Sequence, residues 1–459
     1  MITHPFVSGG LKEEIWEITV NTEAMTPGAK TTGIPIHLYS QPGITVTVDW
    51  GDGTESVLTS ASYSSASDSA PSVHEYATAG TYIVQMKSTK WKSAYIDTLG
   101  NDSTGVLRHM EGFRSTLVEV GLLPRCKGVL YRSSSTSRLI RYSNSFFCCF
   151  RGCSNLTSIP AGLFDNNLEV TNFSSCFYGC SNLASIPAGL FDNNPKVTNF
   201  GSCFYGCSSI TSIPNGLFDN NPAVTDFSSC FNACSSITSI PNGLFDNNPK
   251  VTNFGSCFGH CSSLTSIPNG LFDNNPDVTS FNCCFWKCLK LQSIPSGLFR
   301  NNSKVTDFHM TFYNCNLSDI PIELFINCPA VTDMSGTFGS NNISSVPSGL
   351  FSSQTLVTTL GNNTNISNGI FSANISSRGV IDIDENLFAN MLNLTQARAA
   401  FSGHYGFSIR FRATELTDIT SFCDKNTEQP VTVYVPAGSA TAEAFHAIAD
   451  KNGIVVVEE

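Results

Sequence analysis

The sequence predicts a mainly β protein with short helices. An N-terminal β-sandwich is followed by a solenoid of stacked coils and by a small β-α-β cap at the C-terminus. Three observations support this prediction: a 27-residue repeat fills the middle of the chain, a strand-and-turn pattern precedes it, and residues 426–459 follow a strand-helix-strand pattern. The length of 459 residues is enough for several domains.

The spacing of one isoleucine defines the repeat. The isoleucine of the S-I-P motif recurs six times at intervals of 27 residues, and two further copies follow at intervals of 26. These positions are Ile159, Ile186, Ile213, Ile240, Ile267, Ile294, Ile320 and Val346. The consensus is L-x-x-I-P-x-G-L-F-D-N-N-x-x-V-T-x-F-x-x-C-F-x-x-C-S-x.

One copy of the repeat cannot fold alone. It offers about nine apolar side chains, each worth roughly 1.5–3 kcal/mol when buried. Ordering its 27 residues costs about 1–2 kcal/mol per residue for the backbone alone. Because stacked neighbours complete the burial and pair the backbone groups, the repeat predicts a solenoid, and a period of 27 lies in the leucine-rich range.

The position of the strand within each coil has two interpretations. The first places a short parallel strand at L-x-x-I, with V-T-x-F-x-x-C-F as a short helix or helical turn that returns to the next strand. The alternative places the strand at V-T-x-F, since periodicity cannot decide between runs this short. The Leu and Phe of G-L-F are expected to point inward. The D-N-N run suits stacked Asx turns, whose identical side chains would form ladders along the solenoid.

The N-terminal region contains a predicted hairpin. Residues 44–54, ITVTVDWGDGT, alternate in polarity and end in a Gly-Asp-Gly turn. Residues 74–86, HEYATAGTYIVQM, contain a turn at the glycine followed by a strand, and the small residues at 60–72 form a loop between the two. We expect Asp49 and Asp52 to shape the turn, with calcium binding as the alternative.

Two stretches carry resemblances to known families. LTSIPAGLFDNN and CFYGCSNL resemble the BspA-like leucine-rich repeats of bacterial surface proteins over roughly residues 117–425. DWGDGT followed by HEY resembles a PKD-type, immunoglobulin-like sandwich over about residues 12–90, in which His74 has a structural role.

The predicted domains follow from these resemblances. Residues 1–95 form the PKD-type sandwich and 96–145 form an irregular N-terminal cap and first coil, which begins at Leu117–Val120. Residues 146–425 form the leucine-rich-repeat solenoid, and 426–459 form the C-terminal cap, with a helix over about 440–450 capped by Ser439.

The BspA-like resemblance implies a secreted or surface-displayed binding protein of the kind found on gut bacteria and in their phages. The first residues, MITHPFVSGGLKEEIW, lack a Sec signal pattern. From the BspA-like resemblance we expect an extracellular or virion-surface location, with a host surface protein or glycan as the partner. The N-terminal domain could contact other virion proteins.

Composition argues against other classes of partner. The formal net charge is −11, and only 13% of residues are charged. Nucleic acid and anionic membranes both attract basic surfaces, so neither is expected as a ligand. No apolar run is long enough for a transmembrane helix, which excludes membrane insertion.

The cysteines form two columns along the repeat. The first column contains Cys149, Cys176, Cys203, Cys230, Cys257 and Cys284, and the second contains Cys153, Cys180, Cys207, Cys234, Cys261, Cys288 and Cys315. Small residues replace the first column at Thr311, Thr337 and Ala400, which favours packing as free thiols. Disulfides and a tetrahedral metal site are the alternatives. We expect no metal and no cofactor.

No catalytic set is evident. The sequence lacks a G-x-S-x-G elbow, and its eight histidines are scattered. Asp382, Asp384 and Glu385 cluster without a second carboxylate at the spacing that glycoside hydrolysis requires, so a solvated turn is expected. The protein is therefore expected not to be an enzyme. A polysaccharide-active enzyme is the third of the functions considered, after the recognition and structural roles described in the next paragraph.

The candidate binding residues lie where the coils differ. The two residues inside C-F-x-x-C vary most while the framework is constant, and they are expected to face solvent in a row. The candidate ligand-binding residues are Tyr178, Tyr205, Asn232, His260, Trp286, Lys287 and Tyr313. A second candidate row consists of Thr157, Thr211, Thr238, Thr265 and Gln292, whose polar groups suit glycan hydroxyls. These rows favour a non-catalytic recognition or adhesion protein. The competing class is a purely structural decoration of a virion or cell surface.

Overall fold

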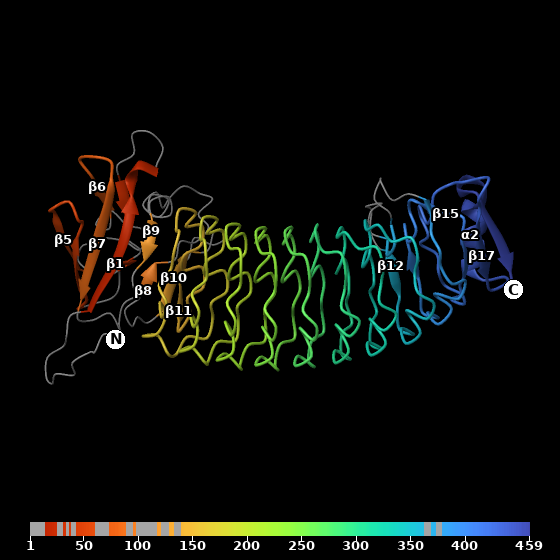
Figure 1. Cartoon of the computed structure of the whole chain (residues 1–459), viewed down its shortest axis with the longest axis horizontal. Helices are drawn as coiled ribbons and strands as arrows, with labels where there is room; N and C mark the ends of the chain where they lie inside the picture. Colours follow the sequence, from red (N-terminus) through yellow and green to blue (C-terminus); the bar gives the residue numbers. More distant parts are fainter. Residues whose placement is uncertain are drawn as a thin grey trace. The chain divides into compact units, whose positions relative to one another are not determined.

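The computed structural model describes the greater part of the chain and divides it into two compact units (Figure 1). The units are Met1–Leu183 and Ala184–Glu459. The described residues are 14–24, 31–33, 36–37, 43–59, 73–88, 95–97, 117–120, 128–132, 139–361, 369–372 and 379–459.

Unit 1 is built from short strands. They are β1 (Glu14–Asn21), β2 (Thr31–Gly33), β3 (Ile36–His37), β4 (Thr45–Asp49), β5 (Glu55–Thr59), β6 (Val73–Glu75), β7 (Thr81–Ser88), β8 (Tyr95–Asp97), β9 (Leu117–Val120), β10 (Gly128–Arg132) and β11 (Leu139–Ser143), with a 3-10 turn at Thr22–Ala24. They form a five-stranded sheet in the order β5-β4-β7-β1-β9, a four-stranded sheet in the order β11-β10-β8-β3, and the pair β2-β6.

The hairpin predicted over residues 44–54 is present. β4 pairs antiparallel with β5, and the pairing closes at Asp49 and Glu55. β7 begins after the glycine turn, as predicted, and pairs with both β1 and β4. The apolar side chains of β1 alternate, so that Trp16, Ile18 and Val20 are buried. The predicted loop at 60–72 lies outside the described residues, and the sandwich arrangement of the sheets remains a prediction.

The position of strand β9 differs from the predicted start of the first coil. Leu117–Val120 does not begin the opening coil, because it pairs antiparallel with β1 at the edge of the five-stranded sheet. Both Leu117 and Val120 are buried there. The coil geometry of unit 1 is described from Ser145 onward, where a parallel bridge joins Ser145 to Asn172 one repeat later.

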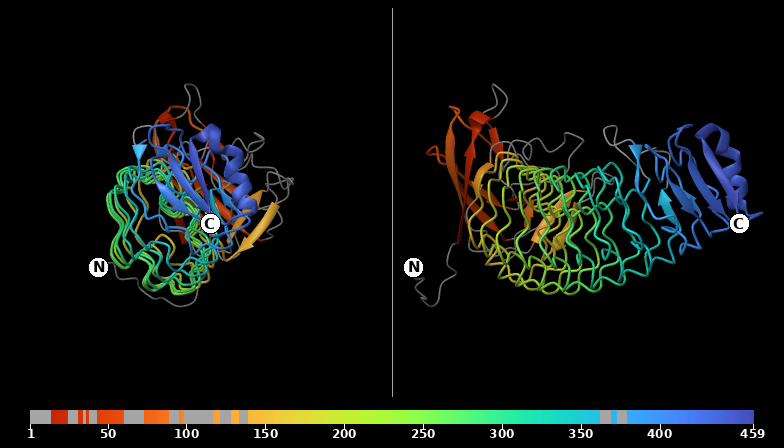
Figure 2. Two further views of the ribbon diagram at one scale, coloured as in Figure 1. Left: turned by 90° about the vertical axis from the view of Figure 1, so that its right-hand side faces the viewer. Right: turned by 45° about the vertical axis from the view of Figure 1, so that its right-hand side comes forward.

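Unit 2 contains the repeated coils. Viewed end-on, the green and cyan coils lie nearly over one another (Figure 2). The coil that begins at Ile210 buries the nine predicted framework side chains: Ile210, Ile213, Leu217, Phe218, Val224, Phe227, Cys230, Phe231 and Cys234. Each phenylalanine of this coil stacks on its counterpart in the next coil. Phe227 and Phe254, for example, have ring centroids 5.9 Å apart at an interplanar angle of 3°.

The parallel bridges lie at V-T-x-F, so the alternative interpretation of the strand position is confirmed. They join Asn199, Asp226, Asn253, Ser280, Asp307, Asp333 and Thr359 in succession. L-x-x-I forms no named strand in these coils, and its main-chain contacts are sparse, such as Thr265 N to Thr238 O at 3.2 Å. The proline that follows the isoleucine lacks an N–H and stops a ladder there.

The expected helical turn is also corrected. After V-T-x-F the chain forms consecutive tight turns, and Ser202, Ser229 and Ser256 have φ values of 55–56°. A left-handed residue in every coil interrupts any helix.

The last asparagine of D-N-N forms a buried ladder. The side-chain amide of Asn221 donates to the carbonyls of Phe191 and Asn194 in the preceding coil, both at 3.0 Å. The corresponding residues Asn248, Asn275 and Asn302 repeat this arrangement. The expected ladder is therefore present, but its bonds run between coils rather than within an Asx turn.

The described cysteines of the coils are free thiols, and all of them except the half-buried Cys283 are buried. In the second column the thiols of Cys180, Cys234, Cys261, Cys288 and Cys315 each donate to a phenylalanine carbonyl of an earlier coil. Cys261 Sγ, for example, lies 3.2 Å from Phe231 O. Burial raises the pKa of Cys261 to about 12. The cysteines therefore pack the core of the coils, as their replacement by threonine and alanine indicated.

The last part of unit 2 changes architecture. Short strands β12 (Thr359–Gly361), β13 (Gly379–Val380), β14 (Gln396–Ala397) and β15 (His404–Tyr405) accompany the last coils. The cap consists of β16 (Ser408–Arg410), β17 (Val431–Val435), α2 (Ala440–Asn452) and β18 (Ile454–Glu458), and its three strands are parallel. The predicted helix is confirmed: Ser439 Oγ accepts from Ala442 N at 3.1 Å, and Gly453 ends the helix at φ 63°.

Candidate recognition surface

The variable pair inside C-F-x-x-C lies on a tight turn between two buried cysteines. Its second position has a left-handed backbone, with φ of 71° at Gly206, 57° at His260 and 58° at Lys287. Glycine adopts this conformation freely, whereas a residue with a Cβ is strained by roughly 1–2 kcal/mol. The left-handed backbone therefore explains the glycine at this position. The five coils that carry Ala233, His260, Lys287, Asn314 or Ser340 instead are strained there.

The pair is less exposed than predicted. Tyr178, Tyr205, His260, Trp286, Lys287 and Tyr313 are half-buried. Asn232 is only 6% exposed, and its Nδ2 donates to Ser256 O at 3.2 Å. The side chains lean along the solenoid; a Cβ added at Gly259 would lie 2.7 Å from Asn232 Nδ2. The expectation that the row faces solvent freely is thus wrong, because each coil covers part of its neighbour.

Three of the predicted residues come together, and we call them the 260–287 patch: His260, Trp286 and Lys287. The His260 and Trp286 rings meet edge to face with centroids 4.4 Å apart. Lys287 Nζ lies 4.6 Å from the centroid of the Trp286 ring, a cation–π contact. Tyr178 has a similar contact in unit 1, where the guanidinium of Arg151 lies 3.9 Å from the centre of its ring.

The patch carries an unbalanced positive charge. Burial, and then the charge of Lys287, lowers the pKa of His260 and so favours the neutral imidazole. Among the described residues no carboxylate forms an ion pair with Lys287, whereas Lys304 pairs with Asp277 at 2.5 Å and Arg300 pairs with Asp273. Trp286 Nε1 is buried without a hydrogen-bond partner in the same part of the chain.

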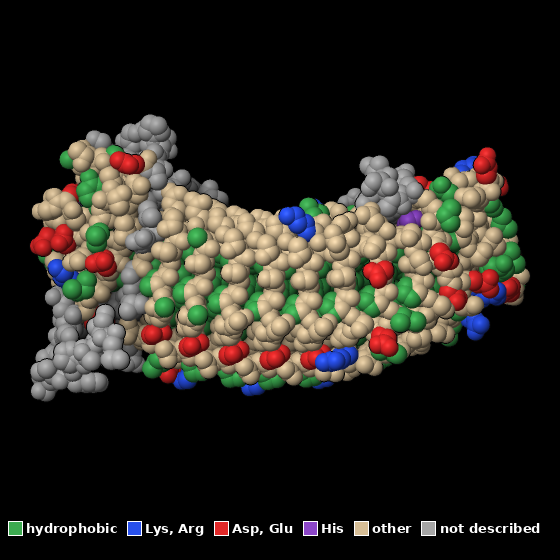
Figure 3. Space-filling model, in the orientation of Figure 1, with side chains coloured by type: hydrophobic (Ala, Val, Ile, Leu, Met, Phe, Trp, Pro, Cys, Tyr) green, Lys and Arg blue, Asp and Glu red, His purple; other side chains and the backbone are tan. Residues whose placement is uncertain are grey.

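The second predicted row is exposed, as its position between two framework residues requires. Thr157, Thr211, Thr238, Thr265 and Gln292 are all exposed. Thr265 Oγ1 donates to Thr238 O at 3.2 Å, so its hydroxyl offers acceptor lone pairs outward. Most of the surface over the middle coils in Figure 3 is uncharged.

The acidic residues weighed as metal or catalytic groups are engaged locally. Asp49 Oδ1 accepts from Gly51 N at 2.9 Å, and Asp52 accepts from Thr54 and lies 2.8 Å from His74 Nε2. Burial acts to raise the pKa of Asp52, but the bonds from Thr54 and His74 outweigh it and hold the pKa below its ordinary value. The His74 ring also stacks on Trp50.

The acidic cluster near residue 384 behaves similarly. Asp384 accepts from Ser348 Oγ and from Asn386 N, both at 2.7 Å, and Glu385 pairs with Arg410. No group of three potential metal ligands is found among the residues that the structure describes. No helix in that part of the chain has the length and apolarity needed to cross a bilayer.

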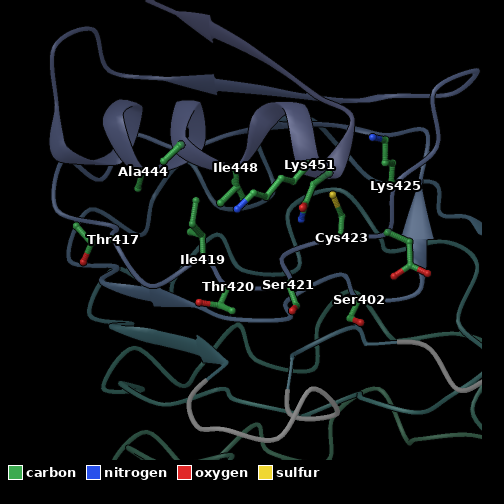
Figure 4. A pocket seen from close by; sticks show the side chains of 13 residues that line it. Ser402, Thr417, Ile419, Thr420, Ser421, Cys423, Lys425, Ala444, Ile448 and Lys451 are labelled. Atoms are coloured by element: carbon green, nitrogen blue, oxygen red, sulfur yellow. The ribbon is translucent and has the colours of Figure 1, made fainter.

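The structure contains a groove beneath α2 that the sequence did not predict. It has a volume of about 660 Å³ and lies between α2 and the last coil (Figure 4). Ile419, Thr420 and Ser421 lie opposite the helix, which contributes Ile448 and Lys451. No single residue signals it, because it exists only where the array of coils ends.

Comparison with known proteins gave structural matches only. No family model and no curated protein matches the sequence. Among solved structures, the leucine-rich repeat domain of APL1B aligns with a TM-score of 0.31 and 12% identity, over 67% of this chain and 82% of that one. TLR13 in its complex with ssRNA13 aligns with a TM-score of 0.32 and 10% identity, over 80% of this chain and 51% of that one. The BspA-like and PKD-type resemblances rest on the motifs alone.

Proposed function

We propose that this chain is a non-catalytic recognition protein and that the 260–287 patch contacts its ligand. The observation that carries the proposal is the unpaired Lys287 ammonium held against Trp286 on a strained backbone. Strain of this kind persists only where the surrounding structure enforces it, and it concentrates at functional positions. The same position holds glycine at Gly152, Gly179 and Gly206 and the smaller residues Ala233, Asn314 and Ser340 in other coils, so the fold itself does not require a lysine.

The chemistry of the patch indicates the kind of ligand. An aromatic ring beside an unneutralised cation suits an anionic group attached to a less polar body. A host-surface glycan that bears a carboxylate, or an acidic protein surface, fits this description. The exposed threonine row supplies hydroxyl acceptors for a ligand rich in O–H donors. Display on an extracellular or virion surface belongs to the same proposal.

Binding measurements with matched variants test the proposal. Lys287→Ala and Trp286→Ala should each weaken attachment in a glycan-array or host-cell adsorption assay by about tenfold or more, as residues central to an interface do. Lys290→Ala is the control, because Lys290 is an exposed lysine on the same coil outside the patch. Equal binding by all three variants would remove the patch from the function.

The competing function is structural decoration. Its support is the run of inter-coil bonds, in which the hydroxyls of Thr225, Thr252 and Thr279 each donate to the threonine carbonyl one coil earlier. Such a stiff array holds its shape without any ligand. Particles or cells that lack the protein would then adsorb to the host as well as those that carry it.

A further inference from the structure

We propose that the groove beneath α2 binds an extended peptide segment of a partner, which adds to the last coil as one more rung. This site is separate from the 260–287 patch and does not depend on the function proposed for it.

Successive coils are joined by main-chain N–H groups at alternate residues. Phe254, Ser256 and Phe258 donate to carbonyls of the next coil at 3.2, 2.6 and 2.9 Å. Near the end of the array, Ala397, Ala399 and Phe401 still donate to Asp418, Thr420 and Phe422 at 2.8–2.9 Å. At these alternate residues the direction is constant, because the earlier coil supplies the donors and the later coil supplies the acceptors. The threonine that precedes them donates the other way, as Thr252 N does to Thr225 O at 2.9 Å.

The last coil has no later coil to receive its donors. Ile419, Ser421 and Cys423 occupy the positions of Ala397, Ala399 and Phe401, and Ser421 has the same left-handed backbone as Ala399, with φ of 56° against 52°. Within the described residues, none of these three N–H groups has a hydrogen-bond partner. Unpaired donors at alternate residues are the feature that a strand added at an open edge satisfies.

The groove has room on the side to which these donors point. All three residues line it, and α2 forms the opposite wall with Ala444, Ala447 and Ile448 (Figure 4). Its volume of about 660 Å³ falls within the range of roughly 300–1,000 Å³ that is usual for ligand sites. The mixed lining suits a peptide, whose backbone meets the donors while its side chains meet the apolar helix face.

The charged residues that line the groove indicate which kind of peptide it would bind. Lys451 lines the groove from α2, and no described residue pairs with its ammonium. Lys425 also lines the groove, and its Nζ donates to Asp450 O at 3.2 Å. The one lining carboxylate, that of Asp424, already accepts from Gly403 N at 2.9 Å. An extended segment with an acidic side chain near Lys451 is therefore favoured over a basic or purely apolar one.

The test uses the full chain and a peptide copied from its own ladder. The probe is residues 416–424 with the cysteine replaced by serine and both ends blocked, because this segment already accepts from Ala397, Ala399 and Phe401. In hydrogen exchange, the amides of Ile419, Ser421 and Cys423 should exchange faster than those of Ala397 and Phe401 in the free protein. Saturating probe should slow them to the rate of the inner amides.

Three matched comparisons decide the outcome. Ala447→Trp should block the groove and abolish probe binding, whereas Glu443→Trp, on the same helix outside the groove, should leave it unchanged. A probe with both aspartates changed to asparagine should bind more weakly, and Lys451→Glu should weaken the binding of the original probe.

Protection of the three amides in the free, monomeric protein would overturn the proposal. Unaltered binding to Ala447→Trp would overturn it as well. Protection that appears only as protein concentration rises would assign the groove to a second copy of this chain instead of a peptide partner.

Discussion

The side-chain amide of Asn248 donates to the main-chain carbonyl of Asn221, one coil earlier, at 3.0 Å. The same amide donates to Phe218 O, also at 3.0 Å. One side chain thus satisfies two carbonyls of the preceding coil where water cannot reach, since Asn248 is fully buried. The apolar framework supplies the burial, and this polar ladder fixes the register of one coil on the next.

Asn248→Ala should therefore destabilise unit 2 strongly. The change removes two hydrogen bonds and leaves two buried carbonyls without donors, which costs about 2–4 kcal/mol. The free energy of unfolding from urea denaturation measures this loss. Asn247→Ala is the control, because Asn247 is exposed, and it should change the unfolding free energy by less than about 0.5 kcal/mol. Similar losses for both variants would show that the ladder is not the source of the effect.

The thiols make a prediction about pH. Burial, and then the charges of neighbouring cysteines, raises the pKa of Cys257 well above its ordinary value, and burial raises that of half-buried Cys283 to about 11. Each thiol is more acidic in the unfolded chain. The unfolded state therefore loses protons first as pH rises above about 9, and stability falls from there upward.

Alkylation followed by mass spectrometry checks this prediction. At pH 8 the folded protein should react slowly at its coil cysteines, and Cys283 should react before Cys257 and Cys284 because it is the more exposed. Addition of denaturant should release all of them at the rate of unfolding. Fast labelling of Cys257 in the folded protein would contradict the burial described above.

Much of this architecture could be predicted from the repeat, because a fixed framework of apolar residues has one plausible arrangement. The strand position could not, since L-x-x-I and V-T-x-F are equally short apolar runs. The deciding factor is the proline after Ile213 and its equivalents, which blocks a ladder on that side. The burial of Asn232 could not be predicted either, because it depends on the glycine at 259 in the next coil. The groove beneath α2 lies where the array of coils ends, and the repeat period carries no information about that end.

His260 gives a direct readout of the 260–287 patch. Its lowered pKa has two causes, burial first and the Lys287 charge second. Lys287→Gln removes the second cause only, so the pKa of His260 should rise toward its ordinary value while remaining below it. An NMR titration of the imidazole measures both values. Because the folded-state pKa is lowered, the neutral ring contributes stability above the unfolded pKa of about 6.5, and this contribution is lost as pH falls. An unchanged pKa in the variant would mean that Lys287 lies away from the ring in solution.

Substitution of two glycines in the β4–β5 turn would distinguish the cost of a steric clash from the cost of backbone strain. Gly51 and Gly53 both have left-handed backbones, with φ of 80° and 87°. A Cβ at Gly51 would lie 2.4 Å from the main-chain oxygen of Ile83, whereas a Cβ at Gly53 would meet nothing within 4 Å. Gly53→Ala should cost only the strain of the left-handed residue, about 1–2 kcal/mol. Gly51→Ala should cost clearly more, because β7 must move away from the turn. The difference between the two unfolding free energies isolates the clash. Equal values would mean that the turn does not lie against β7 as described.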